Sequence, residues 1–215
     1  IMHDNTIDRT TDGKGKVSDY TLAELRKFHL KNGLGRVTFH PIPTLEEVLE
    51  LTKGKILINI DKGYDYFQEV YKLLVKTQTI DQVVIKSGYA YEKVKGENGD
   101  VLDKVIYMPI VDLNNPDAEA FIEGYRQMKP VAMECCFSEV TPEVLRLLQK
   151  VKDNGSKIWL NGLWPSLNGG HDDDRAVELN QKDESWGWLL EKGASLIQTD
   201  RPVQLLQYLK EEGRR

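Results

Sequence analysis

The chain has 215 residues, of which 40% are hydrophobic and 29% are charged, and its formal net charge at pH 7 is −5. A chain of this length can bury one sizeable core, and no shift in composition marks a linker, so residues 1–215 are expected to form a single domain. The 29 basic and 34 acidic residues leave no basic surplus for nucleic acid or an anionic membrane surface. No apolar run has the roughly 20 residues that a membrane-spanning helix needs. We therefore expect neither a nucleic-acid partner nor stable membrane insertion.

The first segment of the chain is unusually polar. Residues 2–15 read MHDNTIDRTTDGKG, in which a histidine–aspartate pair precedes an arginine and a glycine-containing turn. Chain termini are where order is usually weakest. The segment is therefore either a frayed tail or part of a chemical motif that the chain enters partway.

Beyond this segment, helical patterns alternate with short apolar runs. Capping boxes and the helical spacing of apolar residues predict helices at six places. These are Thr21–Glu24, Thr44–Gly54, 67–74, 141–151, 186–192 and the segment from Pro202. Short runs rich in branched or aromatic side chains, typical of buried parallel strands, lie between them. These runs are residues 56–60, 83–85, 105–111, 131–137, 157–163 and 195–199.

The alternation of strands and helices predicts an α/β fold with a parallel sheet, either a closed barrel or an open doubly wound sheet. The glycine fingerprint of a dinucleotide-binding fold and the P-loop pattern are both absent from the sequence, which favours the barrel. A (β/α)8 TIM barrel has eight strands, whereas only six runs are visible. We therefore expect a barrel that lacks two strands at its N-terminal side and retains about six β/α units.

In such a barrel, catalytic groups lie where the strands end and lead into the helices. This rule selects a group of rim residues that includes Asn59, Asp61, Lys62, Lys86, Asp112, Glu134, Glu139, Trp159, Asn161 and Asp200. Carboxylates are suitable ligands for Mg²⁺ or Ca²⁺, and lysines neutralise phosphate oxygens, so this mixture suits a metal-assisted reaction on a phosphate ester. Each carboxylate could equally cap a helix or pair with a basic side chain.

Two other features have structural interpretations. The loop Asn168–Arg175 has three successive aspartates beside His171, and it is expected to shape the substrate site more readily than to bind a metal. Cys135 and Cys136 are adjacent in an apolar run, so their side chains should point to opposite faces as buried thiols without a mutual disulfide.

Three segments together resemble the glycerophosphodiester phosphodiesterase family. They are HDNTIDRTTDGKG at 3–15, TLAEL at 21–25 and IPTLEEVL at 42–49. QTDRP at 198–202 is similar to the family's last-strand signature, so the matches run in order along the chain. The resemblance implies a TIM barrel that uses a divalent cation to hydrolyse glycerophosphodiesters to glycerol 3-phosphate and an alcohol.

The resemblance also implies that segments found in family members are missing before residue 1. Members begin with His-Arg-Gly, Pro-Glu-Asn-Thr and Glu-x-Asp segments, and this chain has none of them. By resemblance, the catalytic pair would be His3 and a second histidine that lies outside the chain, and two of three metal carboxylates would lie outside it as well. The chain alone is therefore expected to be inactive.

The remaining site residues come from the same resemblance and from the rim rule, which is the basis for Lys86 and Glu134. The family's third metal ligand is a glutamate in Asn-x-Glu-x-Lys, and this chain reads Asn59–Gly63, so Asp61 is expected to bind the cation with a shorter reach. Substrate-binding positions are expected at Lys62, Lys86, Glu134 and Trp159. Lys62 would face outward if the strand continued through it, and Trp159 could line the substrate cleft or pack in the core.

The leading hypothesis is a metal-dependent phosphodiesterase with a small-molecule substrate. A phospholipase of the same superfamily, acting on inositol or choline phospholipids, and a noncatalytic barrel that binds a phosphate ligand are the alternatives. Many relatives work outside the cytoplasm, which favours a periplasmic or extracellular location. The oligomeric state is left open.

Overall fold

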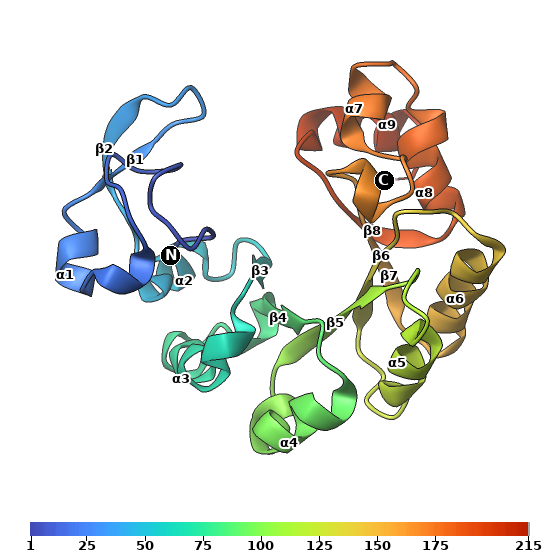
Figure 1. Cartoon of the computed structure of the whole chain (residues 1–215), viewed down its shortest axis with the longest axis horizontal. Helices are drawn as coiled ribbons and strands as arrows, with labels where there is room; N and C mark the ends of the chain where they lie inside the picture. The colour runs from blue at the N-terminus through green and yellow to red at the C-terminus, as the bar shows by residue number, and fades with distance from the viewer. Residues whose placement is uncertain (215) are drawn as a thin grey trace. The chain divides into compact units, whose positions relative to one another are not determined.

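The computed structural model describes residues 1–214, which divide into two compact units, 1–83 and 84–214 (Figure 1). The strand–helix alternation confirms the predicted α/β class. The six predicted apolar runs form six strands within residues 1–214, β3 to β8, each followed along the chain by a helix.

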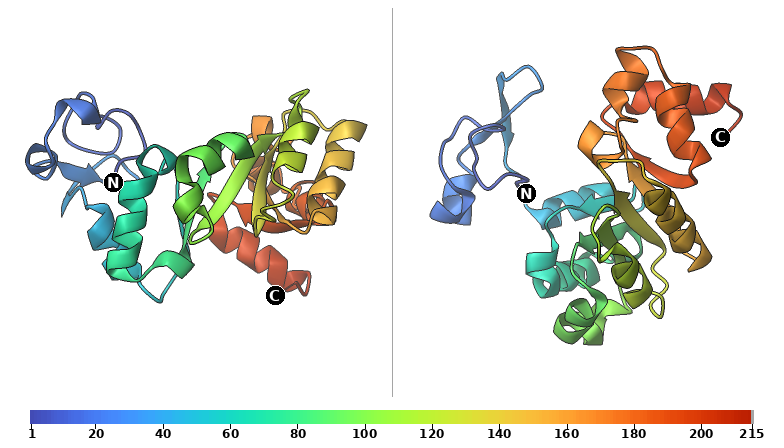
Figure 2. Two further views of the ribbon diagram at one scale, coloured as in Figure 1. Left: turned by 90° about the horizontal axis from the view of Figure 1, so that it is seen from below. Right: turned by 45° about the vertical axis from the view of Figure 1, so that its right-hand side comes forward.

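The first unit opens with the polar segment and a small hairpin. Helix α1 (Leu22–Leu25) precedes strands β1 (His29–Lys31) and β2 (Val37–Pro41), which pair antiparallel. This hairpin was not predicted, because its strands are only three and five residues long and show no apolar alternation. Figure 2 shows it from two further sides. Helix α2 (Leu45–Thr52), strand β3 (Ile58–Ile60) and helix α3 (Phe67–Thr77) complete the unit.

Both predicted capping boxes are present in this unit. Thr21 and Thr44 each accept a hydrogen bond from the backbone N–H three residues on, and Glu24 and Glu47 each accept one from the N–H of the capping threonine. These reciprocal bonds satisfy donors that a helix start would otherwise leave unpaired, which is why α1 and α2 begin where the sequence predicts.

The second unit is a parallel sheet with helices along it. Strands β4 (Val83–Ser87), β5 (Ile106–Asp112), β6 (Ala132–Cys136), β7 (Lys157–Asn161) and β8 (Ala194–Gln198) pair in chain order. The helices between them are α4 (Tyr91–Leu102), α5 (Ala118–Gly124), α6 (Pro142–Asp153), α7 (Asp173–Val177) and α8 (Trp188–Glu191), and α9 (Pro202–Glu211) follows β8. Helices α5 and α6 lie side by side (Figure 1).

The register of this sheet decides which side chains share a face. Glu134 pairs with Trp159, and Asn161 pairs with Gln198. Ile158 and Leu160, which flank Trp159 in β7, are fully buried. Alternation therefore places the apolar residues on the opposite face from the polar ones, which leaves the latter available for a site.

Two smaller expectations concern cysteines and membrane spans. Cys135 and Cys136 are free thiols without a mutual disulfide, as predicted, and Cys135 is buried whereas Cys136 is only half-buried. Burial raises the pKa of Cys136 to about 12, so it is protonated at neutral pH. Among the helices of the described chain, none is long and apolar enough to cross a bilayer.

Candidate active site

His3 lies between two carboxylates. Its Nδ1 is 2.8 Å from Asp4 Oδ1, and its Nε2 is 3.1 Å from Asp61 Oδ2. The His3 side chain is 60% exposed, so it remains accessible to a ligand. The structure therefore places two of the sequence-predicted site residues, His3 and Asp61, in direct contact within the first unit.

Asp4 is itself held by Arg9. The guanidinium donates from Nε to Asp4 Oδ2 at 2.6 Å and from Nη2 to Asp4 Oδ1 at 2.9 Å. This two-pronged geometry fixes the plane of the carboxylate as a single contact would not. The Arg9 hydrogen bonds, and then the one from His3, hold the pKa of Asp4 well below its usual range. Asp4 is therefore ionised at neutral pH and presents a fixed acceptor to His3.

The polar segment folds as an ordered turn. Ile7 is fully buried, and its carbonyl accepts hydrogen bonds from the N–H and the hydroxyl of Thr11. A Cβ on Gly13 would lie 2.5 Å from an Ile7 side-chain atom and 2.7 Å from a Phe28 atom, so only glycine fits there. The frayed-tail alternative is wrong, because this segment packs against the rest of the first unit.

Lys62 also reaches this cluster. Strand β3 ends at Ile60, and Lys62 adopts a left-handed backbone conformation with φ of 57°. Its Nζ donates to the His3 carbonyl at 2.9 Å. Because β3 ends before Lys62, strand alternation does not determine the direction in which the Lys62 side chain points. A lysine in this conformation is strained by about 1 kcal/mol, a cost that often marks functional sites.

The first unit offers one oxygen ligand for a divalent cation rather than a complete set. Asp61 has the hard carboxylate that Mg²⁺ or Ca²⁺ prefers, and it follows directly after β3. Across residues 1–214, no group of three or more His, Cys, Asp or Glu side chains is arranged to hold a metal ion. Asp61 therefore fits a cation site only as a single contributor.

In the second unit, Lys86 and Glu134 form a buried ion pair. Lys86 Nζ donates to Glu134 Oε2 at 2.8 Å, and the two side chains are only 6% and 5% exposed. Removing two charges from water is costly and offsets their attraction, so a buried ion pair contributes little net stability to the fold. Lys86 lies near the end of β4, whereas Glu134 is the middle residue of β6.

Trp159 lies beside this pair on β7. It is half-buried and pairs in register with Glu134, so the two side chains share a face of the sheet. Its indole Nε1 is buried without a hydrogen-bond partner among the described residues. Trp159 therefore has the partly exposed ring expected of a residue that lines a site, and it also has an unused donor.

Each of the three successive aspartates in the 168–175 segment has different partners. Asp172 caps α7 by accepting from the Arg175 N–H, and Asp174 pairs with Arg201 at 3.2 Å. Asp173 is 3% exposed and accepts from Trp186 Nε1, Thr199 Oγ1 and the Asp200 N–H. These contacts give the aspartates capping and anchoring roles.

The contacts of Asp173 also explain the QTDRP segment. Thr199 and Asp200 donate to Asp173 Oδ2 at 2.8 and 2.7 Å, and Trp186 donates to Oδ1 at 2.8 Å. We call Asp173, Trp186, Thr199 and Asp200 the clasp. Sequence inspection missed it, since no spacing rule links an aspartate to partners 13 and 26 residues further along the chain.

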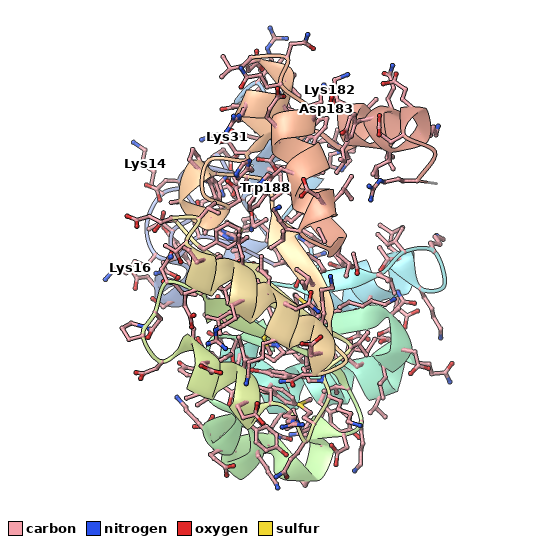
Figure 3. The ribbon with its side chains drawn as sticks, turned by 90° about the vertical axis from the view of Figure 1, so that its right-hand side faces the viewer. Lys14, Lys16, Lys31, Lys182, Asp183 and Trp188 are labelled. Carbon is pink, nitrogen blue, oxygen red and sulfur yellow. The ribbon has the colours of Figure 1, made fainter. Side chains whose placement is uncertain are left out.

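The other three histidines have partners elsewhere. His29 Nδ1 lies 3.5 Å from Asp12 Oδ2, and the His40 ring packs against Phe39. His171 stacks on Trp188, which is labelled in Figure 3, with centroids 3.8 Å apart and planes 1° apart. Burial lowers the pKa of His171. None of these contacts resembles the arrangement around His3.

Sequence inspection also missed the partners of His3. Asp4 and Arg9 were seen as part of a motif, but the hydrogen bonds that join them to His3 were not foreseen. The signal was the adjacency of a histidine, an aspartate and, five residues on, an arginine before a glycine turn. A tight turn brings residues at this spacing back together.

Comparison with known proteins gives a family. A family profile described as a domain of unknown function matches residues 107–209. A glycerophosphodiester phosphodiesterase of Caldanaerobacter subterraneus is 44% identical over 220 residues, which cover 99% of this chain and 81% of that protein.

Solved structures show a similar fold. A glycerophosphoryl diester phosphodiesterase from Parabacteroides distasonis has a TM-score of 0.75 at 24% identity, covering 98% of this chain and 70% of that one. An Oleispira antarctica phosphodiesterase, solved with the product sn-glycerol-3-phosphate, has a TM-score of 0.67 at 17% identity and covers 98% and 78%. Because the Caldanaerobacter relative matches nearly the whole chain, this protein belongs to the glycerophosphodiester phosphodiesterase family.

Proposed function

We propose that the protein hydrolyses glycerophosphodiesters to sn-glycerol 3-phosphate and an alcohol, with His3 as one of two acid/base histidines. Family membership supports the activity, and the two carboxylates at the ring nitrogens of His3 support its role. The β/α units would form a barrel of the TIM type, as the family resemblance implies. A periplasmic or extracellular location is proposed on the same basis.

On this proposal, each ring nitrogen of His3 has its own task. Asp4 accepts the Nδ1 proton, so it fixes the orientation of the ring and stabilises the protonated form. Nε2 is then the atom that takes a proton from an attacking hydroxyl or returns one to a departing alkoxide. Lys62 holds the His3 backbone through its carbonyl, which limits how far the ring can move.

A divalent cation, Mg²⁺ or Ca²⁺, is part of this proposal. When bound, such an ion offsets negative charge on the phosphoryl oxygens. Asp61 would contribute one oxygen to it. In the second unit, Lys86 would neutralise a phosphate oxygen, with Glu134 holding its ammonium in place.

The test is turnover of glycerophosphocholine by the protein expressed from its complete reading frame. We expect His3→Ala to lower kcat on the order of 10²- to 10⁴-fold, the contribution of one general acid or base. His29→Ala is the matched control, because His29 pairs with Asp12 at a separate place in the fold. An active His3→Ala variant would refute the role of His3, and an inactive wild-type protein supplied with Mg²⁺ and Ca²⁺ would refute the activity.

A further inference from the structure

A cavity of about 300 Å³ in the second unit is lined by the segments that follow β5 and β6 and by residues of helices α5 and α6. This volume is at the lower end of the range for small-molecule sites in proteins. Its apolar lining includes Leu113 and Leu147, which are only 2% and 1% exposed. None of its lining residues belongs to the His3 cluster or to the Lys86–Glu134 pair. The cavity is therefore a separate place where a small molecule can contact core side chains.

Three glutamates also line the cavity, and two of them are already paired with a basic side chain. Arg146 Nη2 donates to Glu119 Oε2 and to Glu143 Oε1, each at 2.6 Å. The third glutamate is Glu139, whose carboxylate has neither a hydrogen bond nor an ion pair within residues 1–214. Its negative charge is therefore available to a cation that enters the cavity.

The backbone of Glu139 is held by the side chain of Asn114, which also lines the cavity. Asn114 Oδ1 accepts from the Glu139 N–H at 3.1 Å and from the Ser138 N–H at 2.7 Å. Asn114 Nδ2 donates to the Glu139 carbonyl at 3.1 Å. A backbone anchored through both its N–H and its carbonyl limits the positions that the Glu139 carboxylate can take. Less conformational freedom is then lost when a ligand binds to it.

The lining residues select the kind of cation. In the part of the chain that the structure describes, none of them is aromatic, so the cavity lacks the ring faces that favour quaternary ammonium groups. None of them is basic either, so a phosphate in the cavity would face Glu139 without a cationic partner. A primary ammonium has three N–H donors, which suit a carboxylate and the neighbouring amide and hydroxyl oxygens.

We propose that this cavity binds a small free primary amine, such as a short amino alcohol. The ammonium donates to the Glu139 carboxylate, and the alkyl chain packs against Leu113 and Leu147. A hydrogen bond between two charged groups gives the ligand its orientation, and burial of the alkyl chain adds to its affinity. The inference does not rest on the proposed function, because it involves none of the residues assigned to catalysis or to the cation.

Calorimetry with ethanolamine, choline and phosphoethanolamine tests the proposal. Choline has the chain, hydroxyl and charge of ethanolamine, but methyl groups replace its N–H donors. We expect the wild-type protein to bind ethanolamine about tenfold more tightly than choline, because choline cannot form the hydrogen bond to a charged partner. Phosphoethanolamine should also bind more weakly than ethanolamine, since its phosphate is repelled by Glu139. Choline that binds as tightly as ethanolamine would overturn the inference. Tighter binding of phosphoethanolamine would identify a phosphate-linked headgroup as the ligand and overturn the assignment to a free amine.

Glu139→Gln should weaken ethanolamine binding by about tenfold or more. Glu92→Gln is the matched control, because it removes the same charge from an exposed position of α4 and should leave the affinity unchanged. Since Glu139 is exposed, both variants should keep the melting temperature of the wild type. In NMR spectra of methyl-labelled protein, ethanolamine should shift the resonances of Leu113 and Leu147, which line the cavity.

Equal losses of affinity in the two variants, or binding that leaves both leucine resonances unshifted, would show pairing at the surface and overturn the inference. A wild-type protein that does not bind ethanolamine would overturn it as well. Neither result would affect the proposed function, which is tested by turnover of glycerophosphocholine and depends on other residues.

Discussion

At the level of single side chains, His3 differs from the other histidines in having a carboxylate within 3.1 Å of each ring nitrogen. The two carboxylates are not equivalent. Asp4 is fixed by Arg9, whereas Asp61 comes directly from the end of a strand. One carboxylate therefore serves to orient the ring, and the other shares the side of the ring that would face a substrate.

Replacing Asp4 by asparagine tests its orienting role. The amide would keep the shape of the side chain and lose the charge that Arg9 and His3 both contact. We expect Asp4→Asn to lower kcat for glycerophosphocholine by at least about tenfold, because a misoriented histidine transfers protons poorly. KM should change less than about twofold, since Asp4 acts through His3. A steady-state comparison with Asp8→Asn, whose wild-type Oδ2 accepts the Gly15 N–H, separates this effect from a change in the turn. If Asp4 had a purely structural role, the kcat values of Asp4→Asn and Asp8→Asn would fall by similar factors.

Sequence inspection identified residues better than it identified their contacts. His3, Asp61 and Lys62 were predicted from the motif, and the structure brings these three together. Their partners were not foreseen, because hydrogen bonds depend on where the backbone turns. The left-handed conformation of Lys62 is an example: alternation predicted an outward side chain for a continuing strand, and the strand ends before that residue.

At the level of elements, the clasp joins the start of α7 to the segments that precede α8 and α9. Asp173 is the common acceptor of all three hydrogen bonds, and it is buried. Its neighbour Asp174 is on the surface and pairs with Arg201. The two adjacent aspartates therefore allow a buried carboxylate that accepts three hydrogen bonds to be compared with a carboxylate in an exposed ion pair.

We expect Asp173→Ala to lower the free energy of unfolding by about 3 kcal/mol or more. The substitution leaves the buried Trp186 donor and the half-buried Thr199 donor without an acceptor, and hydrogen bonds to a charged group contribute about 1.5–3 kcal/mol each. Asp174→Ala should cost less than about 1 kcal/mol, as exposed ion pairs do. Urea denaturation followed by tryptophan fluorescence compares the two. Equal losses for both variants would argue against the clasp.

Helices α5 and α6 are joined by an exposed network that responds to acid. Hydrogen bonds from Arg146, and then from Lys150, lower the pKa of Glu119 to about 2 from an ordinary value near 4.5. Because the folded pKa lies below the unfolded one, the stabilisation is full above about pH 4.5 and is lost as the pH falls toward 2. We expect the urea midpoints of wild type and Glu119→Gln to differ at about pH 6 and to converge near pH 2. A constant difference across this range would contradict the assignment.

At the level of the whole molecule, the alternation of apolar runs and helical patterns was enough to predict six strands and their order along the chain. Their bounds shifted by one or two residues, as at β3, where the predicted start at 56 moved to Ile58. The β1–β2 hairpin escaped prediction because its pairing is stabilised by contacts with the polar segment, such as the Lys31 N–H to the Thr10 carbonyl. Contacts between distant segments leave no periodic pattern in the sequence.

The charge of the whole chain predicts how it behaves at a lipid surface. The first unit has several exposed lysines, among them Lys14 and Lys16, which Figure 3 labels. With a net charge of −5, however, repulsion from an anionic bilayer should outweigh this local attraction. In sedimentation with phosphatidylserine-containing vesicles at about 0.15 M salt, we expect the protein to remain in the supernatant. Co-sedimentation that high salt reverses would instead identify the lysines as a docking patch.

The clasp has a consequence for exchanging parts between relatives. A protein engineer who transplants only the segment after β7 with the start of α7 would carry Asp173 along and leave its donors behind. The recipient must then already have an indole and a hydroxyl at the positions of Trp186 and Thr199, or the new loop will have a buried charge without its three hydrogen bonds. Substitutions at these three positions are therefore expected to be tolerated only in combination, so residues 173–200 should be transferred as one unit.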